Sequence, residues 1–322
     1  MIPAGAVTWQ SLPVAIWREY EGAAVAPSDH PTLVSIGNFD GVHRGHQAVL
    51  AQCRTHHAEL PIAAVTFDPH PLAVVAPERA PRRLTTFERR VELLRAHGAD
   101  EVRVLAFDSE MASWSPDDFV RRVIVEQLHA ELVVVGENFR FGHKAAGDLA
   151  FLREAGARHG FDVEGLAIVS DGGALSSTRV RELVAAGDLP GAALVLGRPH
   201  EVSGVVRRGD QRGRELGFPT ANVPVDESYA VPPDGVYAGW LVRGDGERLP
   251  AAISVGTNPT FDGVERRVES YVLDRTDLDL YGEAIRVEFV ERLRGMVAYE
   301  GVEPLIAQMH DDVAQTRRLL GL

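Results

Sequence analysis

The sequence predicts two domains: a doubly wound α/β domain with a parallel sheet, and then a small antiparallel β-barrel with a C-terminal helix. The chain has 322 residues, whereas a single hydrophobic core rarely grows beyond about 250–300 residues. Up to about Ala186, short apolar runs alternate with longer helical patterns. After about Gly197, short strand-like runs are separated by turns rich in Gly, Pro and Asp. We place the domain boundary between residues 187 and 188, giving domains 1–187 and 188–322.

Five apolar runs in the first domain predict its strands. Their near-continuous apolar character is typical of strands buried on both faces, as in a parallel sheet. Thr85 with Glu88, and Ser115 with Pro116, predict helix N-termini between these runs. The alternation of strand and helix places ligands at the carboxyl ends of the strands. The runs are residues 33–36, 62–67, 102–107, 132–135 and 163–169.

The second domain is predicted to contain short strands and one closing helix. A helical pattern over residues 182–198 forms a bridge between the two domains. From about Glu303 the apolar residues recur at helical spacing and predict an amphipathic C-terminal helix. The predicted strands are residues 202–206, 235–243, 251–255, 267–273 and 285–292.

The net charge and the composition limit the kinds of molecule that the protein is expected to bind. The net charge of −13 opposes general binding to nucleic acid or to a membrane surface. No apolar run approaches the ~20 residues of a membrane span, and residues 1–17 do not resemble a signal peptide. The single cysteine, Cys53, excludes an intrachain disulfide and fits a reducing compartment. We expect a cytoplasmic protein with small-molecule partners, no nucleic acid and no membrane; the sequence leaves its oligomeric state open.

Two histidines stand three residues apart directly after the first predicted strand. Residues 37–47 contain three glycines and open a helix, so backbone N–H groups and the positive end of that helix should lie at the ligand edge. At this spacing His43 and His46 can face the same side and stabilise charge that grows on a phosphate during nucleotidyl transfer. The alternative interpretation is a surface histidine pair or half of a metal site.

A second candidate anion site lies at residues 176–181. Hydroxyl side chains occupy a helix N-cap, and Arg179 and Arg181 follow in the first turn. Cations are unfavourable at the positive end of a helix, and an anionic ligand would remove that conflict. The alternative is an ordinary capped helix with solvated arginines.

The second domain offers a different phosphate site. The sequence contains no G-x-x-x-x-G-K-[ST] loop, so a kinase activity here would not use a Walker A loop. Residues 209–222 form a glycine-rich loop with two arginines, which can wrap phosphates. Thr220 and Asn222 alternate along one short strand, so both oxygens could face a Mg²⁺ ion that also touches ATP. The alternative is a solvated basic hairpin.

The motifs of the first domain resemble the HxGH nucleotidyltransferase superfamily, and together they look like prokaryotic FAD synthetase. Residues 66–71 and 136–142 agree with this resemblance. It implies adenylyl transfer from the co-substrate ATP to FMN, giving FAD, with His43 and His46 as catalytic residues. The implied ATP-binding residues are Gly37, Phe39, Asp40, His43, His46, Asn138, Ser176, Ser177, Thr178, Arg179 and Arg181. The implied FMN-side residues are Phe67, Asp68, Pro69, His70 and Pro71.

The second domain resembles riboflavin kinase, a family with a six-stranded barrel. The resemblance implies phosphorylation of riboflavin to FMN by ATP, with Glu269 as the general base for the ribityl hydroxyl. Its implied magnesium ligands are Thr220 and Asn222. Arg275 departs from the family pattern, which often has phenylalanine there, and the turn that follows is one residue longer. The implied ATP- and flavin-binding residues are Gly209, Arg212, Gly213, Arg214, Gly217, Pro219, Thr220, Asn222, Asn258 and Thr260.

Two rival interpretations remain at this point. One is a flavin-binding or regulatory protein that kept the folds and lost one or both activities, which the presence of every residue with an implied chemical role disfavours. The other is adenylyl transfer to a different acceptor, such as nicotinate mononucleotide or phosphopantetheine. The kinase signature disfavours it, because the product of the second domain would be the substrate of the first. The resemblance covers residues 31–320, nearly the whole chain.

Overall fold

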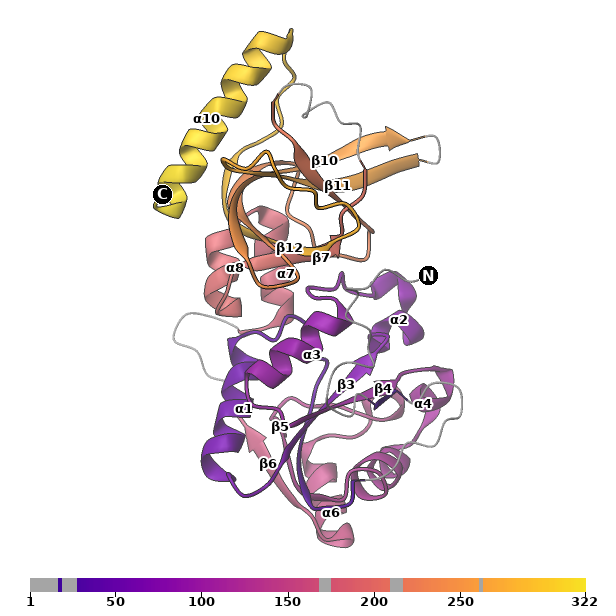
Figure 1. Cartoon of the computed structure of the whole chain (residues 1–322). Coiled ribbons are helices and arrows are strands. Elements are labelled where there is room, and N and C mark those ends of the chain that lie inside the picture. Colours follow the sequence, from indigo (N-terminus) through magenta and orange to yellow (C-terminus); the bar gives the residue numbers. More distant parts are fainter. Residues whose placement is uncertain (1–16, 19–27, 168–174, 209–216, 261–262) are drawn as a thin grey trace, which may run out of the picture. The chain divides into compact units, whose positions relative to one another are not determined.

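The computed structural model describes residues 17–18, 28–167, 175–208, 217–260 and 263–322, and it divides into two compact units (Figure 1). The first unit consists of residues 1–81 and 87–175. The second consists of residues 82–86 and 176–322. The short segment 82–86 therefore belongs to the second unit although it lies within the first half of the sequence.

The first unit is built on one parallel sheet with the strand order β1-β4-β3-β2-β5-β6. Four of the five predicted strands are confirmed, and the fifth is confirmed to Leu166, since Ala167 lies outside β6 and residues 168–169 lie outside the described residues; the two-residue β1, which pairs with β4, was not predicted. Successive strands run outward from β2 to β4, and the chain then crosses to β5 on the other side of β2. The carboxyl end of β2 is therefore the topological switch point, where ligands of such sheets bind. The strands are β1 Trp17–Arg18, β2 Thr32–Ile36, β3 Ile62–Asp68, β4 Glu101–Ala106, β5 Ala130–Gly136 and β6 Asp162–Leu166.

Apolar side chains cover both faces of this sheet. Leu33 packs with residues of α1 and α3, whereas its neighbour Val34 packs with residues of η3 and α6 on the opposite face. The predicted helix start at Ser115 is confirmed, since its Oγ accepts a hydrogen bond from the Asp118 N–H at 3.1 Å. The helices are α1 Arg44–His56, α2 Pro71–Val75, η2 Pro77–Arg79, α3 Phe87–Ala96, α4 Ser109–Ser113, α5 Pro116–Phe119, the π-helical η3 Val120–Val125, η4 His143–Ala145 and α6 Leu149–His159.

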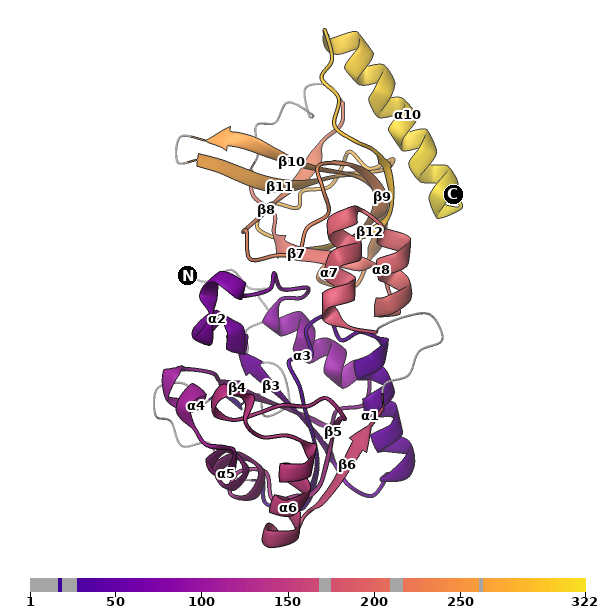
Figure 2. The same cartoon turned by 180° about the vertical axis from the view of Figure 1, so that it is seen from behind.

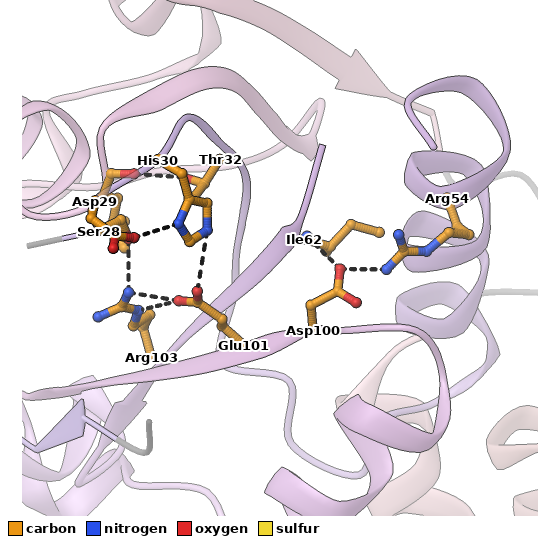
Figure 3. A network of polar contacts seen from close by, with 10 residues as sticks. Ser28, Asp29, His30, Thr32, Arg54, Ile62, Asp100, Glu101 and Arg103 are labelled. Carbon is orange, nitrogen blue, oxygen red and sulfur yellow. Dashed lines mark hydrogen bonds and ion pairs between the residues drawn. The ribbon is translucent and has the colours of Figure 1, made fainter. Parts of the chain in front are cut away.

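A polar network lies at the amino ends of the strands (Figure 3). The buried Arg103 pairs with Glu101 at 2.6 Å and donates to Ser28 Oγ at 2.7 Å. Thr32, the first residue of β2, donates its hydroxyl to the Leu128 carbonyl at 2.6 Å. Burial lowers the pKa of Arg103, and its pairing with Glu101 opposes that shift. These contacts fasten the segment before β2 to the sheet at the edge opposite the expected ligand site.

The second unit is an antiparallel sheet with the strand order β7-β12-β9-β10-β11-β8. Its edge strands come together, because the Arg207 N–H, just after β7, donates to the Asn222 carbonyl of β8 at 2.8 Å. The six-stranded, nearly closed barrel is thereby confirmed. Its interior holds fully buried side chains such as Val223, Tyr237 and Phe289. The strands are β7 His200–Val205, β8 Thr220–Val225, β9 Gly235–Val242, β10 Arg248–Thr260, β11 Gly263–Val272 and β12 Ala284–Arg294.

The predicted helical bridge consists of two helices that lie side by side, α7 Ser177–Ala186 and α8 Leu189–Leu196 (Figure 2). Segment 82–86 packs against these helices through Leu84. Its backbone also pairs with residues 228–230, since the Arg83 N–H donates to the Ser228 carbonyl at 2.7 Å and the Arg83 carbonyl accepts from the Ala230 N–H at 2.9 Å. These elements share one apolar cluster. It contains Leu84, Val180, Leu183, Val184, Ala192, Leu196 and Ala230.

The predicted C-terminal helix is α10, Val302–Leu320, which packs along β9, β10 and β12 (Figure 1). Its buried Asp312 receives two hydrogen bonds from the Arg294 guanidinium, at 2.9 and 2.7 Å. Such a two-pronged ion pair fixes both distance and orientation, so it anchors α10 to the end of β12. Of the helices described, none is long and apolar enough to cross a membrane.

Candidate active sites

The loop after β2 makes a sharp turn that delivers two histidines to the carboxyl edge of the first sheet. Its backbone has positive φ at Phe39 (48°), Gly41 (80°) and Val42 (39°). Positive φ is unfavourable for a β-branched residue and persists only where the surroundings impose it. Phe39 and Val42 are 3% and 0% exposed, so core packing supplies that constraint. Buried packing at Phe39 and Val42 therefore accounts for the unfavourable backbone conformation of this loop.

His43 and His46 lie together, as their spacing predicts. His43 is the N-cap of α1 and is 4% exposed, and the two imidazole rings stack at 3.7 Å between centroids. Phe39 packs edge-on against His46 at 5.0 Å. Burial, followed by the charges of His43 and Arg90, lowers the pKa of His46 well below its usual value of 6.5. His46 is therefore a neutral imidazole at neutral pH, positioned at the start of a helix.

Two other predicted stretches reach the same edge of the first sheet. β3 and β5 are the hydrogen-bonded neighbours of β2. Residues 67–71 include the last two residues of β3 and the three that follow it, and the exposed Asn138 follows β5. His70 also has a local role, because its Nδ1 accepts from the Leu72 N–H at 3.2 Å and caps α2. The sheet order thus gathers the histidine loop and both flanking loops, as a doubly wound fold requires.

Arg90 of α3 is a buried residue at this edge of the sheet that was not predicted from the sequence. It is 7% exposed, and its Nη1 lies 3.2 Å from the Asn38 carbonyl, 3.1 Å from Thr66 Oγ1 and 3.0 Å from the Phe67 carbonyl. A signal does exist in the sequence. Arg90 occupies the helical stripe of Phe87, Val91 and Leu94, where an arginine indicates a buried charge with partners.

The serine–threonine–arginine cluster is placed in the second unit, at the start of α7. The predicted cap is confirmed, since Ser176 Oγ accepts from the Arg179 N–H at 3.1 Å. Arg179 is exposed and pairs with Glu182 at 3.3 Å. Arg181 donates to the Arg82 carbonyl. The histidine motif belongs to the first unit. It therefore remains a prediction that the two histidines and the serine–threonine–arginine cluster bind the same ATP molecule.

The candidate kinase residues lie on one face of the barrel sheet. The β8–β11 register places Asn222 directly opposite Glu269, and Thr220 opposite Tyr271. Directly opposed residues of antiparallel strands point to the same face. Val223 and Val268, one residue along each strand, are fully buried on the other face. The half-buried Glu269 carboxylate is therefore placed beside the side chains predicted to bind magnesium.

The donor chemistry of Thr220 and Asn222 fits a magnesium ion. Asn222 Oδ1 is buried and accepts no hydrogen bond from the described residues, whereas Nδ2 lies 3.3 Å from both Thr220 oxygens. Amide orientation follows from the hydrogen-bond network, and a half-turn of the amide would set Oδ1 beside Thr220 Oγ1. Uncharged oxygens of this kind suit Mg²⁺, which keeps several waters and binds substrate phosphates.

A cavity of about 340 Å³ opens beside these residues. The turn after β11 borders it, and there Arg275 pairs with Asp277 at 2.7 Å. Arg275, which stands where the family often has phenylalanine, therefore forms an ion pair within the turn at the edge of the cavity. The cavity is lined by Val206, Arg208, Pro219, Thr220, Ala221, Asn222, Ser270, Val272, Arg275, Thr276, Asp277, Leu278, Asp279, Leu280 and Tyr281.

The remaining predicted kinase residues are only partly described. Gly209, Arg212, Gly213 and Arg214 lie outside the described residues. Gly217 has a φ of +87°, which glycine adopts readily, and it leads into β8 through Phe218 and Pro219. Asn258 and Thr260 lie on β10, which pairs with β11. Their predicted roles stay predictions.

Comparison with known proteins identifies both halves of the chain. A family model described as FAD synthetase matches residues 25–179, and one described as riboflavin kinase matches residues 196–320. A bifunctional riboflavin kinase/FMN adenylyltransferase from Escherichia coli K12 is 38% identical over 90% of this chain and 93% of its own length. The protein of the same description from Pseudomonas fluorescens is 39% identical over 91% and 94%. That from Bacillus subtilis 168 is 32% identical over 89% and 92%.

A solved structure shares the fold over most of its length. A crystal structure described as a macrolide-efflux protein from Streptococcus pneumoniae matches with a TM-score of 0.82 and 29% sequence identity. The match covers 91% of this chain and 95% of that one. It supports an α/β unit followed by a barrel unit as one shared architecture.

Proposed function

Because the chain belongs to the bifunctional riboflavin kinase/FMN adenylyltransferase family, we propose that it makes FAD from riboflavin in two ATP-dependent steps. The N-terminal FAD synthetase domain is the FMN adenylyltransferase, and the C-terminal domain is the riboflavin kinase. We place the boundary between residues 187 and 188, in the stretch that neither family model covers, although α7 packs within the second compact unit. ATP, riboflavin and FMN are the substrates, and FAD and pyrophosphate leave the second reaction.

In the kinase reaction, Glu269 is the general base. Its carboxylate takes the proton from the terminal ribityl hydroxyl of riboflavin as the hydroxyl oxygen attacks the γ-phosphate of ATP and ADP departs. Thr220 and Asn222 would hold Mg²⁺, which neutralises charge on the ATP phosphates when bound. The observation that carries this proposal is the register of β8 and β11, which sets Glu269 opposite Asn222.

In the adenylyltransferase reaction, His43 and His46 stabilise the transition state. An oxygen of the FMN phosphate attacks the α-phosphate of ATP, and the bond to pyrophosphate breaks. The stacked imidazoles donate hydrogen bonds to the charge that grows on the α-phosphate. Asn138 and residues 176–181 are the further proposed ATP-binding residues, and residues 67–71 shape the FMN side. No covalent enzyme intermediate is needed, because positioning and charge stabilisation supply the catalysis.

The direct test is a coupled assay resolved by chromatography. Purified full-length protein with riboflavin, ATP and Mg²⁺ should produce FMN first and FAD later, and a magnesium chelator should stop FMN formation. FMN without FAD would contradict the adenylyltransferase assignment. Flavin binding without either product would support the regulatory-protein alternative. Adenylylation of nicotinate mononucleotide in preference to FMN would support a different acceptor.

Separate expression of the second unit provides a further prediction. Residues 190–322 should phosphorylate riboflavin and make no FAD, because the histidine motif is absent. This fragment lacks Leu84, Val180, Leu183 and Val184, which pack on Leu196 in the full chain. A fragment of residues 176–322 restores α7, so it should unfold at a higher temperature and show the same kinase activity. FAD formation by either fragment would show that the assignment of the domains is wrong.

Some predictions rest on composition alone. A cytoplasmic location and a lack of nucleic-acid and membrane partners follow from charge, cysteine content and hydropathy. Fractionation of cells that express the protein, with flavin assays on each fraction, would test the location.

A further inference from the structure

We propose that Arg90 is a positioning residue for adenylyl transfer, which braces the loop carrying His43 and His46 against the loop on the flavin side. The inference rests on the proposed function of the first domain. It adds to that function a residue of α3 that lies outside the sequence motifs of the first domain.

The hydrogen bonds of Arg90 join the ends of two adjacent strands. Its Nη1 donates to the Asn38 carbonyl in the histidine loop at 3.2 Å and to the Phe67 carbonyl at the end of β3 at 3.0 Å. Thr66 Oγ1 lies between them, 3.1 Å from Nη1 and 3.0 Å from the Asn38 carbonyl. One guanidinium nitrogen and one hydroxyl therefore tie both loops together.

Burial makes this brace rigid. Arg90 is 7% exposed and Thr66 is 0% exposed, so water does not compete readily for these hydrogen bonds. A buried guanidinium is costly unless it is hydrogen-bonded, and here its Nη1 lies within hydrogen-bond distance of two main-chain carbonyls and the Thr66 hydroxyl oxygen. Removing Arg90 would take one donor from each carbonyl and leave the Thr66 hydroxyl as the remaining link to Asn38, so the two segments would be held together less firmly.

The reaction depends on the distance between the ATP-binding and FMN-binding segments that Arg90 and Thr66 hold together. His43 and His46 follow Asn38 and are proposed to hold ATP, whereas residues 67–71 are proposed to hold FMN. The attacking phosphate oxygen must lie in line with the α-phosphate, and a displacement of about 1 Å can cost ~10²-fold in rate. The charge of Arg90 also reaches the site, since it contributes to the lowered pKa of His46 after burial and His43.

The test uses Arg90→Met and Arg90→Lys in the full-length protein, with FMN and MgATP supplied. Arg90→Met should lower kcat for FAD formation by ~10- to 10²-fold, with smaller changes in either KM, because both substrates still bind but are misaligned. Arg90→Lys should recover part of kcat, since an ammonium keeps the charge and reaches fewer acceptors. Arg89→Met, on the same helix and paired with Glu92, is the matched control and should leave both activities unchanged.

Thr66→Val keeps the packing and removes the shared hydroxyl, so it tests the brace without removing a charge. It should lower kcat for FAD formation in the same direction by a smaller factor. The double variant with Arg90→Met should lose less than the product of the two single losses, because both residues act through Asn38. Because the second domain is expected to act alone, thermal unfolding of each variant, compared with wild type, reports whether the first domain is folded.

Three results would overturn the inference. One is an unchanged kcat in Arg90→Met. Another is a fall in the unfolding temperature of the first domain that parallels the loss of kcat across Arg90→Met, Arg90→Lys and Thr66→Val, which would indicate a stability role alone. The third is full additivity of the Thr66 and Arg90 losses. A wild-type protein that makes no FAD from FMN would instead contradict the proposed function of the domain.

Discussion

Glu269→Gln is expected to lower the rate of FMN formation by ~10²–10⁴-fold, the usual contribution of general-base catalysis. The amide keeps the size and polarity of the side chain but cannot accept a proton. Because it can still accept a hydrogen bond from the ribityl hydroxyl, KM for riboflavin and for MgATP should change little. Initial rates of FMN formation, measured by chromatography over a range of both substrates, provide the comparison.

Further variants distinguish loss of the general base from disruption of the β-sheet that carries it. Glu269→Asp should recover part of the rate, limited by a carboxylate set back by ~1 Å from the reacting hydroxyl. Glu291→Gln makes the same change at an exposed position on β12 of the same sheet and should leave the rate unchanged. Adenylylation of supplied FMN should continue in every variant. A near-normal rate in Glu269→Gln would remove Glu269 from the mechanism and leave β11 as scaffold.

Local patterns were sufficient to predict most of the fold. The strands around β2 are buried on both faces, so they appear in the sequence as unbroken apolar runs. β1 could not be predicted in this way, because two residues that pair only with β4 leave no periodic pattern. Segment 82–86 was also missed, since its membership of the second unit depends on contacts with residues 228–230, far away in the sequence.

The candidate sites show the same difference between residues that are close in sequence and residues that are distant. His43 with His46, and Thr220 with Asn222, are close in sequence, so their spacing on a helix start or a strand predicts that they face one side. The pairing of Asn222 with Glu269 depends on the register of two strands distant in sequence, and only the family resemblance pointed to it beforehand. Arg90 could not be assigned from its helix alone, because its partners lie at the ends of other elements.

His46→Ala is expected to lower the rate of FAD formation from FMN and ATP by ~10²–10³-fold, the scale of losing one preorganised donor to a developing charge. The His46 ring stacks on His43 at 3.7 Å, so the substitution removes one of two adjacent imidazoles without changing the loop sequence. Kinase activity in the same sample should be unchanged. His56→Ala, at the exposed far end of the same helix, is the matched control and should leave both activities intact.

The pH dependence of stability provides a second, independent measure of the His46 environment. Its pKa is lowered in the folded protein, chiefly by burial, whereas an unfolded chain titrates near 6.5. As pH falls below about 6.5 the unfolded state binds a proton that the folded state does not, so the free energy of unfolding decreases. Between about pH 7.5 and pH 5.5, wild type should therefore lose more stability than His46→Ala in chemical denaturation. Equal losses would show that His46 titrates normally, and equal loss of kinase and adenylyltransferase activity in His46→Ala would point to a structural role for this imidazole.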